Sequence, residues 1–85
     1  KEELACNSVI LENLNMFNTQ KEFDTSVKLR YRTHAVPCHV IIKDDTAYVT
    51  LKENVFGVAA GQAAVFYDDN KLIGGGWISQ ASNLI

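Results

Sequence analysis

At 85 residues the chain is long enough for one small domain with a single hydrophobic core, because a chain of this size buries somewhat over ~60% of its unfolded surface. Its 47% hydrophobic and 21% charged residues are typical of a globular domain, and no apolar run approaches the ~20 residues that a membrane span needs. The net charge of −2 argues against a general nucleic-acid binder.

The first predicted strand covers residues 5–12, around the apolar run Val9–Leu11. Three asparagines within residues 13–18 then predict a turn, since asparagine tolerates the left-handed conformation and bonds to its own backbone. We expect the apolar side chains of this turn to lie under one end of the fold: Leu14, Met16 and Phe17.

The central predicted strand covers residues 25–33 and contains six residues that alternate between apolar and basic. Because a strand has a period of two, its two faces carry different sets: Val27, Leu29 and Tyr31 on one, and Lys28, Arg30 and Arg32 on the other. We expect the first set in the core and the second in solvent, as a row of cations about 6.6 Å apart. Residues 25–52 hold five Lys or Arg against two Asp, so the positive charge is concentrated around this strand.

Residues 38–43 and 47–51 are predicted to form a hairpin, because apolar runs flank Asp44-Asp45, which is typical of a tight turn. Pro37 has no N–H and fits the start or the edge of a strand. Residues 53–60 are predicted to be a loop, since Gly57 and Gly61 interrupt the apolar pattern there.

The last two predicted strands cover residues 62–67 and 71–78, joined by a turn at 68–70. The first is apolar throughout, so we expect it to be buried on both sides, with Val65 and Phe66 in the core beside Val49 of the hairpin. The second contains Gly74–Gly76, which we expect where the barrel bends. About six strands with short turns predict an all-β fold, a small closed barrel of mostly antiparallel strands.

The basic face of the central strand is the first candidate site. Lys28, Arg30 and Arg32 suit contacts with the phosphates of a nucleic acid, but charge on a strand face also serves solubility, so the pattern alone leaves both interpretations open. Aromatic rings can stack on bases. Tyr31 alternates onto the apolar face, whereas the pattern assigns Trp77 neither to the core nor to stacking.

Three other patterns favour structural interpretations. Gly74–Gly76 precedes a strand-like sequence and not the helix that a phosphate-binding loop needs. Adjacent acidic residues, as in Asp68-Asp69, are typical of solvated turns. Cys38 lies between His34 and His39, yet no orienting third group is marked, so a buried inert thiol is predicted.

The chain has two cysteines, Cys6 and Cys38, and no C-x-x-C pair. A zinc site needs about four ligands at close spacing, so no metal site is predicted. A single disulfide has no support in the pattern, and reduced thiols in a cytosolic protein are the simpler interpretation. The first six residues lack the pattern of a signal peptide, and Lys1 in place of an initiator Met leads us to expect a fragment of a longer protein.

Four blocks of the chain resemble the C-terminal domain of bacterial tRNA-specific 2-thiouridylases in order and spacing: Lys28–Arg32, Val36–Cys38, Gly61–Tyr67 and Gly74–Gly76. Leu14-Asn15 and Phe17 are similar to the family's entry into this domain. The resemblance covers nearly the whole chain and is strongest from Val27 to Ile78. The chain departs from the family at Ala59-Ala60, where Thr-Pro is frequent, and at 68–70, where glycine is frequent.

This resemblance implies that residues 1–85 are one β-barrel domain, the C-terminal fragment of a larger enzyme whose N-terminal ATP-binding catalytic domain is absent from the chain. The parent would be a cytoplasmic tRNA-uridine 2-sulfurtransferase that activates the wobble uridine with ATP and magnesium. Its sulfur would come from a persulfide donor protein. The ATP-binding loop and both catalytic cysteines would belong to the N-terminal domain, so no catalytic residue, cofactor or metal ligand is expected in the barrel.

The implied partners of the barrel are tRNA, held with Lys28, Arg30 and Arg32, and its own catalytic domain, with no membrane contact. One alternative is a purely structural barrel that packs on the catalytic domain without touching RNA. Another is a barrel that binds a flavin or a nucleotide. The net charge of −2 and the lack of a helix-capped glycine loop weigh against this last alternative.

Overall fold

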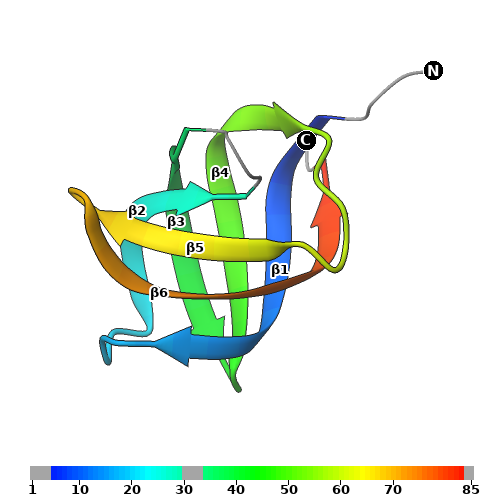
Figure 1. Cartoon of the computed structure of the whole chain (residues 1–85). Coiled ribbons are helices and arrows are strands. Elements are labelled where there is room, and N and C mark those ends of the chain that lie inside the picture. Colours follow the sequence, from blue (N-terminus) through cyan, green and yellow to red (C-terminus); the bar gives the residue numbers. More distant parts are fainter. Residues whose placement is uncertain (1–4, 30–33, 84–85) are drawn as a thin grey trace.

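The computed structural model describes residues 5–29 and 34–83, and these residues form a closed barrel. The strands in chain order are β1 (Ala5–Met16), β2 (Glu22–Lys28), β3 (Val36–Lys43), β4 (Thr46–Phe56), β5 (Ala63–Asp68) and β6 (Lys71–Ser82). Each pairs antiparallel with its neighbours in the order β1-β4-β3-β2-β5-β6, and β6 pairs back with β1 (Figure 1). The predicted all-β barrel of six antiparallel strands is confirmed. Across the described ranges no helix is long and apolar enough to cross a membrane.

Side chains from every strand fill the interior of the barrel. The largest fully buried one is Phe66, whose ring meets Phe23 edge to face with centroids 6.3 Å apart. Four residues predicted for the core are confirmed as buried: Val27, Leu29, Val49 and Phe66. Tyr31, also predicted for the core, lies outside the described residues.

The prediction that residues 62–67 are buried on both sides is wrong. Along β5, Ala64 and Phe66 point inward, whereas Ala63 is exposed and Val65 is half-buried on the outer face. A single closed sheet has one interior, so every second residue of a strand must face outward. The apolar run therefore places apolar side chains on the outside of the barrel, and Val65 is not a core residue.

Three strands extend four or five residues beyond their predicted ends: β1 to Met16, β4 to Phe56 and β6 to Ser82. β1 continues through the predicted turn at 13–18 as far as Met16, because Asn13 takes a φ of 53° and the pairing with β6 shifts register between Glu12 and Asn15. Such a bulge lets the strand bend without ending. Leu14 and Met16 pack against the core as expected, but Phe17 is 63% exposed.

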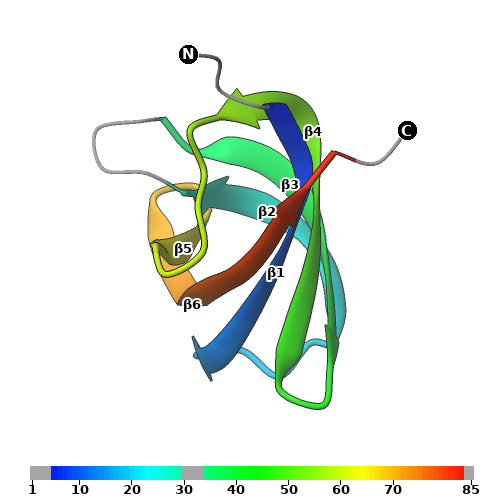
Figure 2. The same cartoon turned by 90° about the vertical axis from the view of Figure 1, so that its right-hand side faces the viewer.

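β4 likewise runs through part of the predicted loop at 53–60, to Phe56, where it pairs with the start of β1. The connection to β5 covers residues 57–62 and runs beside β6 (Figure 2). Two hydrogen bonds hold it there, from the Gly61 N–H to the Ile78 carbonyl and from the Ile78 N–H to the Gln62 carbonyl, both 2.8 Å.

Tight turns join β3 to β4 and β5 to β6. Asp44 and Asp45 have φ values of 52° and 63°, and Asp69 and Asn70 have 51° and 70°. Positive φ at both central residues matches the right-handed twist of the flanking strands. The predicted turns at both places are confirmed. β3 begins two residues earlier than predicted and includes Pro37, which is exposed.

Candidate nucleic-acid interface

The alternation along β2 places Lys28 on the outer face of the barrel. Its neighbours Val27 and Leu29 are 0% and 2% exposed, and Lys28 between them is half-buried. The other two predicted RNA-contacting residues, Arg30 and Arg32, lie outside the described residues. Of the predicted cationic row, the structure therefore locates one member, and contact of all three with RNA stays a prediction.

Lys28 lines a polar groove of about 400 Å³ between the end of β2, the start of β3 and the β5–β6 turn. The groove is lined by Ser26, Lys28, His34, Ala35, Tyr67, Asp69 and Asn70. The Thr25 hydroxyl donates a 2.6 Å hydrogen bond to the Tyr67 carbonyl and ties β2 to β5 beside it. Among the described residues, no carboxylate forms an ion pair with Lys28 within 4.0 Å, although Asp69 lines the same groove.

A second charged group, which the sequence did not predict, lies on the outer face of β2, β3 and β4. His39 Nδ1 is 2.8 Å from an Asp24 carboxylate oxygen, and His39 Nε2 is 2.8 Å from a Glu22 carboxylate oxygen. The Lys52 amine lies 3.9 Å from Asp24. The hydrogen bonds with Asp24 and then Glu22 raise the pKa of His39, and the same contact with His39 lowers the pKa of Asp24.

The positive charges of His39 and Lys52 are largely neutralised by Asp24 and Glu22, so the cluster has little net charge to attract an anionic ligand. The described residues contain no group of three or more His, Cys, Asp or Glu side chains that could hold a metal ion. The alternation of Glu22, Phe23 and Asp24 in the sequence does indicate that both carboxylates lie on the same face of a strand. The contact with His39 follows only from the β2–β3 register, which places Asp24 opposite His39.

Both cysteines are free and buried, and neither pairs with a histidine. Cys38 is 0% exposed, and burial raises the pKa of its thiol to about 12. His39 follows it in β3 and therefore faces the opposite side of the sheet. His34 is exposed and lies 3.7 Å from Glu53. The Cys–His arrangement does not form, and the prediction of a buried thiol at Cys38 is confirmed.

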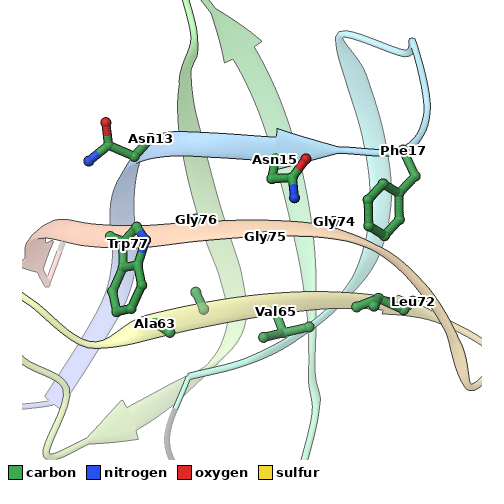
Figure 3. A pocket seen from close by; sticks show the side chains of 11 residues that line it. Asn13, Asn15, Phe17, Ala63, Val65, Leu72, Gly74, Gly75, Gly76 and Trp77 are labelled. Atoms are coloured by element: carbon green, nitrogen blue, oxygen red, sulfur yellow. The ribbon is translucent and has the colours of Figure 1, made fainter.

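A third outer feature is an apolar groove of about 270 Å³ over β1, β5 and β6, which we call the glycine groove (Figure 3). Gly74–Gly76 form its floor, Trp77 lies at one end, and Phe17 and Leu72 lie at the other. Its remaining lining residues are Asn13, Asn15, Ala63, Ala64 and Val65. Trp77, which the sequence pattern left unassigned, is 52% exposed and lies outside the core.

The three glycines lie in the middle of β6 and pair with β5 and β1. A Cβ on Gly75 would collide with the Ala64 carbonyl oxygen, and a Cβ on Gly76 would lie 2.9 Å from the Glu12 carbonyl oxygen. Close approach of neighbouring backbones therefore explains these glycines. β6 continues past the glycines to Ser82, so they lie within a strand and do not open a helix as a phosphate-binding loop does.

Comparison with known proteins gives one family and a consistent set of relatives. The family model described as the aminomethyltransferase beta-barrel domain matches residues 6–78. The tRNA-specific 2-thiouridylase MnmA of Sulfurimonas denitrificans is 74% identical over 78 residues, and that of Nitratiruptor sp. is 62% identical over 78 residues. The MnmA protein of Campylobacter lari is 50% identical over 80 residues. These matches cover 92–93% of this chain but 23–24% of the relatives' own length.

Proposed function

The chain belongs to the aminomethyltransferase beta-barrel domain family, and on this premise we propose that it is the C-terminal accessory domain of a tRNA-uridine 2-sulfurtransferase. The observation that carries the proposal is the 74% identity with a tRNA-specific 2-thiouridylase over 92% of this chain. In this proposal the barrel helps to hold tRNA while the reaction takes place elsewhere in the polypeptide.

The chemistry of the parent enzyme is assigned to the part of the polypeptide outside residues 1–85. That part would bind ATP with magnesium, activate the wobble uridine, and receive sulfur from a persulfide donor protein in the cytoplasm. The buried, free Cys38 and the glycines fixed within β6 support a non-catalytic role for the barrel, because neither offers a nucleophile or a phosphate cradle.

The outward position of Lys28 supports the proposed tRNA contact. Continued alternation would put Arg30 and Arg32 on the same face as Lys28, and positive charge around β2 would meet tRNA phosphates. Such contacts fix the position of the RNA without reading its sequence. The half-buried Lys28, free of an ion pair with any described carboxylate, supports this role over that of a neutralised surface charge.

The test is tRNA affinity across a salt series for the full-length enzyme and its Arg30→Ala/Arg32→Ala variant. Each lost phosphate contact lowers the slope of log affinity against log salt by about 0.7–0.9, so the double variant should flatten the slope by roughly 1.5. The matched control is Lys21→Ala/Lys43→Ala, which removes two exposed cations elsewhere on the chain and should leave the slope unchanged. If the arginine variant keeps both slope and affinity, the barrel is a structural domain without RNA contact.

A further inference from the structure

The glycine groove gathers three of the six large hydrophobic side chains that are exposed among the described residues. Phe17 is 63%, Trp77 is 52% and Leu72 is 46% exposed, and all three line the same groove. Soluble monomers rarely expose large contiguous apolar patches unless a partner covers them. The floor between these side chains is glycine backbone, so a partner's side chains could approach the sheet closely (Figure 3).

The size and the charge of the groove argue against two classes of occupant, a small molecule and a nucleic acid. Its volume of about 270 Å³ is below the ~300–1,000 Å³ of typical small-molecule pockets. Among the described residues that line the groove there is no Lys or Arg, and Glu12, which pairs with Trp77 across β1 and β6, has an exposed carboxylate. The described residues that line the groove offer a nucleic acid no neutralising charge, and Glu12 would repel a phosphate near Trp77.

We propose that the glycine groove is the surface on which this barrel docks against the rest of its own polypeptide. The inference rests on the proposed function, in which the barrel is one domain of a longer enzyme. More than three quarters of each of the relatives compared lies outside the part that this chain matches. A tethered domain is present at a high effective concentration, so an apolar groove of modest area suffices to hold it.

This docking also places the proposed RNA contact at the edge of the domain interface. Val65 of the groove is the Cα partner of Lys28 across the β2–β5 pair, and both side chains lie on the outer face. A domain that covers the groove would therefore reach as far as Lys28 on β2. A tRNA that contacts Lys28 would then lie across the junction between the barrel and the rest of the enzyme.

Hydroxyl-radical footprinting tests the docking, with oxidation rates compared between the 85-residue chain and the full-length enzyme without tRNA. The expected result is that oxidation of Phe17, Leu72 and Trp77 falls in the full-length enzyme to the level of buried Phe66. Ile41 and Tyr48 are the matched controls, because they are 42% and 45% exposed and lie paired on β3 and β4. Their oxidation rates should be the same in both proteins.

Four outcomes overturn the proposal. Equal oxidation of Trp77 in both proteins shows that the groove stays open. Protection that requires added tRNA makes RNA the occupant, and protection that grows with protein concentration makes it a second copy of the chain. Equal protection of the Tyr48 controls shows general burial of the barrel. None of these results depends on the salt slope of tRNA binding, so either the docking or the tRNA contact can be contradicted while the other stands.

A pair of variants in the full-length enzyme gives an independent measurement. Phe17→Asp/Leu72→Asp places two charges in the groove and should restore oxidation of Trp77 to its rate in the 85-residue chain. Ile41→Asp/Tyr48→Asp adds the same charges to the control surface and should leave Trp77 protected. Continued protection of Phe66 shows that the barrel of each variant is folded. A Trp77 that stays protected in the groove variant contradicts the docking.

Discussion

Replacing Cys38 by serine separates a structural thiol from a catalytic one. The Cys38 side chain is 0% exposed within the core, where a free cysteine behaves as a small apolar side chain. A serine hydroxyl buried there should lower the free energy of unfolding by about 1–3 kcal/mol, with the smaller loss if it bonds to the Thr25 backbone as the thiol does. That is a substantial part of the roughly 4–13 kcal/mol expected for a domain of this length, and the melting temperature should fall by roughly 4–8 °C per kcal/mol.

The assay is urea unfolding of the 85-residue chain, with Cys38→Ala as the matched control. Alanine removes the sulfur without adding a polar group, so it should lose about 1 kcal/mol, and serine should be the less stable of the two. In the full-length enzyme the serine variant should transfer sulfur normally per folded molecule. A serine variant more stable than the alanine variant would refute the burial argument. Normal folding with complete loss of sulfur transfer would make Cys38 catalytic.

The reactivity of the same thiol, the His39 contacts and the glycine floor give three further predictions. Burial raises the pKa of the Cys38 thiol from the usual 9.0 to about 12, so very little of it is ionised at pH 8, and iodoacetamide should label Cys38 at a rate set by unfolding. The pKa of His39 is raised in the folded state, so its stabilisation is fully present below the unfolded value near 6.5 and is lost as pH rises through the folded value. The wild type should therefore lose urea stability relative to His39→Gln as pH rises above about 6.5, and parallel profiles would contradict this. Gly75→Ala forces a Cβ against the Ala64 carbonyl oxygen and should destabilise the chain by more than Gly61→Ala, which meets no atom within 4 Å but has a φ of 93°. Equal urea midpoints for these two variants would contradict this, because they would show that β5 moves away from β6 at little cost to make room for the Cβ.

The parts of the fold that depend on local pattern were predictable from the sequence. The alternation Val27-Lys28-Leu29 gave the correct inward and outward faces, and the aspartates at 44–45 gave the correct turn. The extent of β1 was not predictable, because Asn13 forms a bulge in a strand held by its neighbours. Asparagine at a left-handed φ is compatible with either a turn or a bulge, and the pairing partner decides between them.

The surface features were harder to predict, because they depend on register between strands distant in sequence. The apolar run around Val65 was misinterpreted as a strand buried on both sides. Its outward residues instead form one wall of a groove whose floor comes from β6 and whose rim includes Phe17 of the segment after β1. The contact of His39 with Asp24 likewise follows from the β2–β3 pairing. In the candidate RNA interface, Lys28 lies half-buried on the outer face, and RNA contact by Lys28, Arg30 and Arg32 stays a prediction.

A cross-linking map of the full-length enzyme with tRNA tests the central claim most directly. Ultraviolet irradiation of the complex, followed by digestion with a protease that does not cleave at basic residues, identifies the peptides bonded to RNA. The account predicts cross-linked peptides that contain residues 25–33, and loss of these cross-links in the Arg30→Ala/Arg32→Ala variant. Cross-links confined to peptides outside residues 1–85 would contradict it and would leave the barrel as a structural domain of the enzyme.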